Sequence, residues 1–245
     1  MLRWFAIGLA LTACESAPQA TAESPAQPQP AHSREQLEAA ASLQLAIMQG
    51  RLADARDLAG QLAVHEMPAR SGWQPYVAEL RDSAHLIARA DDVAAAGAEL
   101  GRLGRACGSC HAASGARPVL AAGVAPTDDT TLAAQMLRHQ WAAVQLWQGV
   151  SGPADQAWQD GARVMVATRA DVHKRVHEKP NAEVFMLAER LHEQARHAAA
   201  LTDVDARAGL YGEVMATCAS CHTIMRPHPV VERAPLVSTR TDQRR

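Results

Sequence analysis

Residues 92–111 read DVAAAGAELGRLGRACGSCH, and residues 203–222 read DVDARAGLYGEVMATCASCH. A shift of 111 residues superimposes the two stretches, including the Cys-x-x-Cys-His (CxxCH) motif at the end of each. The agreement extends beyond the motifs, because both stretches begin with Asp-Val and both carry glycine at the tenth position. A repeat of this kind indicates that the chain contains two copies of one structural unit.

Each stretch also carries an apolar stripe with helical spacing. In the first, the stripe residues are separated by 3, 4, 3, 4 and 3 positions: Val93, Ala96, Leu100, Leu103, Cys107 and Cys110. The second keeps the pattern, with Arg207 as its polar exception, through Val204, Tyr211, Val214, Cys218 and Cys221. This period matches an α-helix, so each stretch is predicted to be a helix whose buried face ends in both cysteines.

The rest of the chain favours helices as well. Alanine is abundant, 48% of the 245 residues are hydrophobic, and only two Phe and two Tyr are present. Long intervals without proline leave room for helices. We expect eight, at about 33–50, 51–65, 73–89, 92–112, 128–148, 154–170, 181–200 and 203–223. The predicted fold class is all-α, with two tandem four-helix bundles at 33–118 and 127–228 and a CxxCH motif on the last helix of each.

The two motifs have the spacing of a c-type haem attachment site. Two cysteines three positions apart on a helix face the same way, so both sulfurs can form thioethers to one haem, and the adjoining histidine reaches its iron. The predicted cofactors are therefore two covalent haem c groups. The residues expected to hold them are Cys107, Cys110, His111, Cys218, Cys221 and His222. A zinc site built from all four cysteines and a redox-active dithiol are the alternatives.

A haem motif on the last of four helices, in an alanine-rich unit of about a hundred residues, resembles the cytochrome c-prime family, here duplicated. That family often places a basic residue four positions after the motif histidine. Arg226 matches this pattern after His222, whereas Gly115 follows His111 and departs from it. The resemblance implies an electron carrier rather than an enzyme, with redox proteins as partners. It also leaves open a sensor or binder of nitric oxide or carbon monoxide, and a two-haem peroxidase is disfavoured because no distal acid or base can be placed.

The resemblance further implies that the second axial position of the iron faces the first helix of each unit. A side chain of that helix either binds the iron there or leaves the position empty. The candidates are Met136 and His139 in the second unit and Met48 in the first. Met48-Gln49-Gly50 matches Trp147-Gln148-Gly149 at a shift of 99, which places Leu37 opposite Met136 and Ala40 opposite His139. Leu37 and Ala40 cannot bind iron, so the first haem is expected to have the more open distal side.

The N-terminus has the pattern of an export signal. A basic start and a short apolar run over residues 1–13 precede Cys14, in a Leu-Thr-Ala-Cys sequence that resembles a bacterial lipoprotein signal. Residues 14–32 are then a lipidated cysteine with a proline-rich tether, and residues 229–245 a flexible tail. The expected location is the periplasm, with a lipid anchor in the membrane. Acidic and basic residues are interleaved and the net charge is −2, which excludes a basic face for nucleic acid.

Overall fold

The computed structural model describes residues 31–67, 72–116, 118, 123–168 and 182–225. In this part of the chain every regular element is a helix, which confirms the all-α class. The eight helices are α1 (Ala31–Met48), α2 (Leu52–Val64), α3 (Gln74–Ala88), α4 (Val93–Ser114), α5 (Leu132–Ser151), α6 (Asp155–Ala167), α7 (Ala182–Ala198) and α8 (Val204–Met225). Each lies where the sequence predicts one, with ends that differ by up to four residues.

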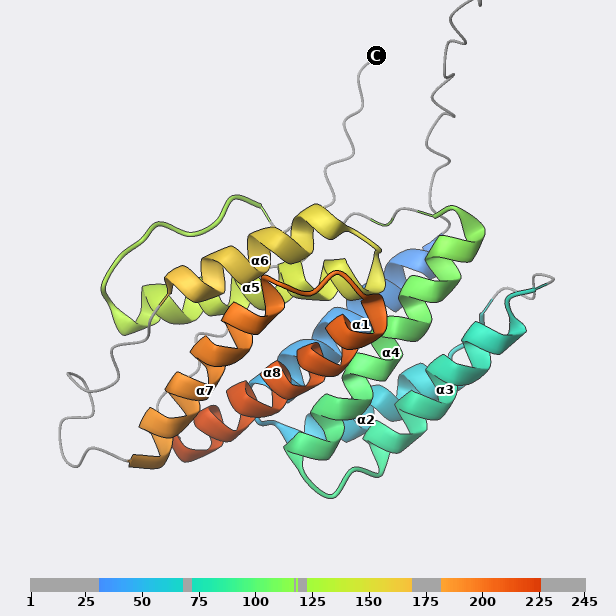
Figure 1. Ribbon diagram of the computed structural model, residues 1–245. Helices are drawn as coiled ribbons and strands as arrows, with labels where there is room; N and C mark the ends of the chain where they lie inside the picture. The colour runs from blue at the N-terminus through green and yellow to red at the C-terminus, as the bar shows by residue number, and fades with distance from the viewer. Residues whose placement is uncertain (1–30, 68–71, 117, 119–122, 169–181, 226–245) are drawn as a thin grey trace, which may run out of the picture.

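The two motif helices, α4 and α8, cross at the centre of the molecule (Figure 1). They approach closely because small residues occupy the crossing. A Cβ on Gly97 would lie 2.9 Å from the carbonyl oxygen of Gly212, and one on Gly101 would overlap the carbonyl oxygen of Ala208. As one helix ascends from 97 to 101 the other descends from 212 to 208, so the pair is antiparallel and related by a pseudo-twofold axis.

Both motif helices begin in the same way. The Asp92 carboxylate accepts a hydrogen bond of 2.8 Å from the Ala95 amide, and the Asp203 carboxylate accepts one of 2.8 Å from the Ala206 amide. Each carboxylate satisfies an amide that has no partner within the first helical turn. Both helices are 22 residues long, and all four of their ends agree at the shift of 111.

The first two helices of each half, α1 and α2 against α5 and α6, match at a different shift from the one that the sequence suggests. Helices α2 and α6 are both 13 residues long and lie 103 positions apart at either end (52 to 155, 64 to 167). The ends of α1 and α5, Met48 and Ser151, are also 103 apart. The shift of 99 read from Met-Gln-Gly and Trp-Gln-Gly is therefore wrong for this part. At 103, Ser33 and Gln36 stand opposite Met136 and His139.

The two halves of the structure, α1–α4 and α5–α8, have exchanged their first helices, α1 and α5. Helix α1 packs more extensively on α8 than on α4, and α5 packs more extensively on α4 than on α8. All eight helices contribute buried apolar side chains to one continuous core. The expected arrangement of two tandem bundles is thus not confirmed, because the motif helix of each half is covered by the first helix of the other half.

Large aromatic side chains fill the middle of this core. Trp147 on α5 and Tyr211 on α8 are both buried, with ring centroids 5.5 Å apart. Arg207, the polar exception in the stripe of α8, lies buried with its guanidinium 5.3 Å from the ring centroid of Trp158, and it donates to Asp155 at 2.5 Å. The exception is therefore an ion pair that joins α8 to α6.

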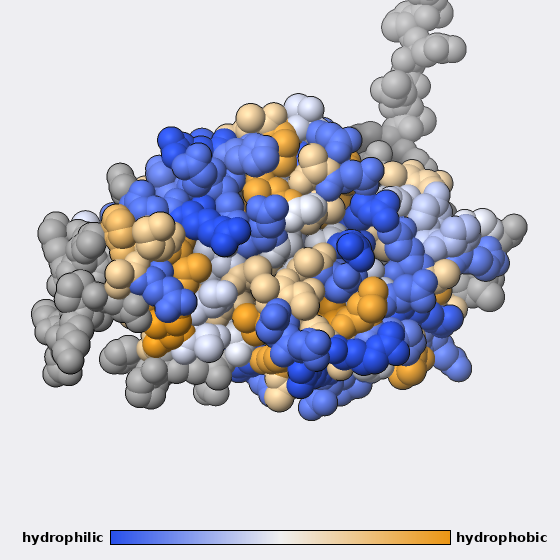
Figure 2. Space-filling view, turned by 60° about the horizontal axis from the view of Figure 1, so that its bottom comes forward, coloured by the Kyte–Doolittle hydropathy of each residue, from blue (hydrophilic) through white to orange (hydrophobic). Residues whose placement is uncertain are grey.

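Polar and apolar residues alternate over the surface. On the face in Figure 2, hydrophilic residues separate small apolar patches. Among the described residues, the exposed large apolar side chains lie apart: Val64 on α2, Leu86 on α3, Val124 between α4 and α5, and Met186 on α7. None of the helices in the described ranges combines the length and the apolar character that a membrane span requires.

Candidate haem-attachment sites

Both CxxCH motifs lie in the last turns of their helices. Cys107, Cys110 and His111 are on α4, and their counterparts Cys218, Cys221 and His222 occupy the same positions on α8. All four thiols are free, so none is consumed by a disulfide. Helical geometry brings the two cysteines of each motif onto one face, as thioether attachment to a single haem requires.

The two motif histidines are held in the same way. The Nδ1 atom of His111 lies 2.6 Å from the carbonyl oxygen of Ser151, at the end of α5. The Nδ1 atom of His222 lies 2.6 Å from the carbonyl oxygen of Met48, at the end of α1. A carbonyl oxygen can only accept, so Nδ1 carries the proton in both rings and Nε2 keeps its lone pair. An iron-binding histidine needs this tautomer, and a hydrogen bond of this kind fixes its orientation.

The surroundings of the cysteines favour neutral thiols. Burial, together with the smaller effect of the partner cysteine in each pair, raises the pKa of Cys107 and of Cys218 to about 12. Burial also raises the pKa of Cys110 and Cys221. All four lie near the C-terminus of a helix, where the helix dipole opposes negative charge. A reactive dithiol needs the opposite, a lowered thiol pKa, so these sites do not fit that alternative.

The two motifs lie at opposite ends of the α4–α8 pair. Each histidine is twelve residues beyond the crossing on its own helix, or about 18 Å at the helical rise. The helices run in opposite directions, which places the motifs on the order of 30 Å apart. No zinc ion can join cysteines at that separation, and no group of three or more metal-binding side chains occurs among the residues described.

The candidate distal residues have different surroundings. His139 is buried on α5, and its Nε2 atom lies 2.8 Å from the carbonyl oxygen of Thr168. Burial lowers its pKa. Met136 is half-buried on the same helix. Met48 is buried in the core, and because α1 is exchanged its carbonyl meets the second motif rather than the first, to which the sequence assigns it.

Several residues singled out in the sequence fall outside the described ranges. These are the segment 1–13, Cys14 with the tether as far as residue 30, Arg226 and the tail 229–245, whereas residues 31 and 32 of the expected tether belong to α1. The carbonyl acceptors of Ser151 and Met48 are the functional groups that sequence reasoning missed. Backbone atoms carry no residue signature, and only the pairing of helices from different halves brings them to the histidines.

Comparisons with protein-family models, with curated proteins and with solved structures gave no match. The arrangement of the motif residues therefore carries the functional argument. In the described part of the chain these residues form two equivalent sites in an all-helical protein, each with two thiols on one helix face and one histidine whose Nε2 can bind a metal.

Proposed function

We propose that the protein is a two-haem c-type cytochrome that carries electrons, with one haem on Cys107, Cys110 and His111 and the other on Cys218, Cys221 and His222. The single observation that supports it most is the matched hydrogen bond from Nδ1 of each motif histidine to a helix-end carbonyl, 2.6 Å in both halves. A histidine that binds iron through Nε2 needs an acceptor for its Nδ1 proton, and both motif histidines have one.

The chain supplies attachment, orientation and electrostatics. The four thiols would anchor the haem groups, and the carbonyls of Ser151 and Met48 would hold the two imidazoles in position. Each haem, when bound, supplies an iron that alternates between its ferric and ferrous states. The surrounding helices set the potential through burial and nearby charge. Because the motifs lie far apart, each site would exchange electrons with its own external partner.

In this proposal the chain is a duplicated unit similar to the cytochrome c-prime family, in which the two copies have exchanged their first helices. Each copy places CxxCH on its last helix, α4 or α8. Cys14 would carry the lipid, and the tether would hold the helical part at a membrane facing the periplasm. The arrangement suits an electron carrier, since redox partners could approach either end.

Binding of a small gas is the second candidate. It is favoured by the position of His139, whose Nε2 atom is hydrogen-bonded to Thr168 and is thus unavailable to an iron. An iron with an empty sixth position would bind carbon monoxide in its ferrous state. Optical titration of the reduced protein separates the two functions. Binding of one or two equivalents favours the gas-binding role, and no binding leaves electron transfer alone.

The proposed function is tested by the mass of the acid-denatured protein, because thioether links survive denaturation. The expected mass is that of the chain plus two haem groups. Replacing Cys107 and Cys110 with alanine should remove one haem, and replacing Cys218 and Cys221 should remove the other. A chain that carries no covalent haem after expression with the haem-attachment machinery would contradict the proposal.

A further inference from the structure

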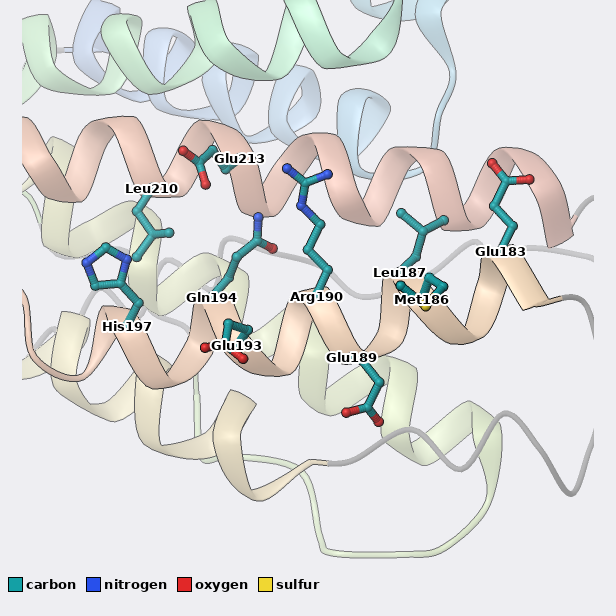
Figure 3. A pocket seen from close by; sticks show the side chains of 10 residues that line it. All are labelled: Glu183, Met186, Leu187, Glu189, Arg190, Glu193, Gln194, His197, Leu210 and Glu213. Carbon is teal, nitrogen blue, oxygen red and sulfur yellow. The ribbon is translucent and has the colours of Figure 1, made fainter.

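A groove runs between α7 and α8, and its volume of about 640 Å³ lies in the range of ligand sites. Figure 3 shows that Arg190 and Gln194 extend from α7 toward α8, where Glu213 lies on the opposite wall. Leu187 and Leu210 add apolar surface to the lining. The groove thus combines charged, amide and apolar groups at an interface where packed helices ordinarily bury apolar side chains.

The amide of Gln194 is buried at this groove without a hydrogen-bond partner. Gln194 is only 6% exposed, and neither its amide nitrogen nor its amide oxygen has a partner among the described residues. An unsatisfied buried amide is costly. Its nitrogen can donate and its oxygen can accept, so a ligand that offers both an acceptor and a donor would satisfy it.

Two groups of opposite charge in the groove also lack partners. Arg190 forms no ion pair or hydrogen bond with any residue in the described ranges, and the same holds for the carboxylate of Glu213. Both side chains are exposed, on opposite walls. They do not pair with each other across the groove. A ligand with an anionic group for Arg190 and a cationic group for Glu213 would pair with both.

The corresponding interface in the first half has no such unpaired cation. Arg105 on α4 pairs there with Glu79 on α3, and it lies 3.5 Å from Asp205. At the shift of 111, Ala216 stands at the position of Arg105, and Arg190 at the position of Glu79. The second half therefore lacks the side chain that crosses the interface in the first half, and Arg190 has no counter-ion there.

The charge of the lining favours a particular kind of ligand. Glu183, Glu189, Glu193 and Glu213 bring four carboxylates to the groove, against the single guanidinium of Arg190. Such surroundings attract a ligand of net positive charge and disfavour one whose charges are mainly negative. Lysine as a free amino acid has one carboxylate, one α-ammonium group and a second ammonium group on an apolar stem. Its net charge is positive, and it still offers an anion to Arg190.

We propose that the α7–α8 groove binds a basic α-amino acid such as lysine. Arg190 pairs with the α-carboxylate, Glu213 pairs with the α-ammonium group, and the Gln194 amide hydrogen-bonds to both. The apolar stem lies along Leu187, and the side-chain ammonium group is directed toward Glu183, which is about 10 Å from Arg190 along α7. Residues of α7 and α8 alone form this site, so the inference does not rest on the proposed haem groups.

The test is isothermal titration calorimetry of the full protein, purified with its cofactors, with three probes that differ by one charged group. The probes are L-lysine, cadaverine, which lacks the carboxylate, and 6-aminohexanoate, which lacks the α-ammonium group. L-lysine should bind most tightly, and each of the other two about tenfold more weakly, because each leaves one charged group of the groove unpaired.

Matched substitutions identify the partner of each group. Arg190→Gln should weaken binding of L-lysine about tenfold without weakening that of cadaverine. Glu213→Gln should weaken L-lysine by a similar factor and change 6-aminohexanoate much less. Gln194→Leu should weaken L-lysine while the fold is kept, since it replaces an unpaired buried amide with an apolar side chain. Glu38→Gln, at an exposed glutamate of α1 outside the groove, is the control and should change nothing.

Each contrary outcome has a definite meaning. If cadaverine binds as tightly as L-lysine, or if Arg190→Gln leaves the affinity for L-lysine unchanged, the groove is only an acidic surface that attracts cations, and the proposal is wrong. Failure of L-lysine to bind at millimolar concentration would also refute it. None of these results bears on the covalent haem groups, which the mass of the denatured chain tests separately.

Discussion

The α3–α4 and α7–α8 interfaces are formed by corresponding helices of the two halves, but their side-chain contacts differ. The first is closed by the Arg105–Glu79 ion pair, whereas the second has Ala216 and Arg190 at these positions and keeps a groove. The motif residues next to them do not differ in this way, because both histidines bind a carbonyl at the same distance. The comparison teaches that the contacts of the motif histidines are the same in both halves, whereas the contacts of the flanking helices α3 and α7 differ.

The α4–α8 crossing is common to both halves, so breaking it should affect both sites at once. Gly101→Val would force a side chain into the carbonyl oxygen of Ala208. We expect a loss of about 3 kcal/mol in the free energy of unfolding, as for an overpacked core. Urea denaturation of the holoprotein measures it. Gly209→Ala is the control, because nothing lies within 4 Å of that position on α8, and it should be neutral or slightly stabilising. Equal stability of the two variants would contradict the close crossing.

His139 distinguishes the halves by its titration, since Gln36 stands at the corresponding position of α1. Burial lowers the pKa of His139 below its ordinary 6.5. The unfolded chain therefore binds the proton first, so the stability contributed by the neutral ring is complete above pH 6.5 and declines as the pH falls below it. His139→Gln should flatten the pH dependence of unfolding below pH 6.5 and cost about 1 kcal/mol at neutral pH.

Urea unfolding at pH 5.5 and 7.5 measures this effect, with His85→Gln on the exposed surface of α3 as the control. A slope that is as steep in His139→Gln as in the wild type would show that His139 does not contribute.

The helix caps should be equal in the two halves. Asp92→Ala and Asp203→Ala each remove one carboxylate that accepts from a first-turn amide at 2.8 Å. Each substitution should cost about 1 kcal/mol, and the costs should add, because the caps lie at opposite ends of the antiparallel pair. Thermal unfolding of the single and double variants measures both. If the two substitutions lower the free energy of unfolding by amounts that differ more than twofold, the N-termini of α4 and α8 are not capped equally.

Much of the helical layout could be predicted from the sequence, because proline positions and apolar periods act locally. The close match of α4 and α8 likewise follows from their long identical spacing. The exchange of α1 and α5 could not be predicted, since an apolar face does not specify which copy will cover it. The sequence also indicated the wrong shift between α1 and α5, 99 residues where the helix ends give 103. Gly50, with φ of 67°, lies just beyond the end of α1, whereas Gly149 lies inside α5, so identical Gln-Gly pairs mark different places.

The candidate site was predictable as far as its chemistry resides in side chains. Cys107, Cys110 and His111, with their counterparts on α8, follow from motif spacing alone. The carbonyls of Ser151 and Met48 do not, because they are backbone groups supplied by the exchanged helices.

The most direct test of the account is the mass of two tryptic peptides from the acid-denatured holoprotein. Trypsin cleaves after arginine except before proline, so the first motif lies in peptide 106–138 and the second in peptide 208–233. We predict that each peptide carries the mass of one haem on its two cysteines. Recovery of both peptides with unmodified cysteines, or of haem on one peptide alone, would contradict the account of two equivalent attachment sites.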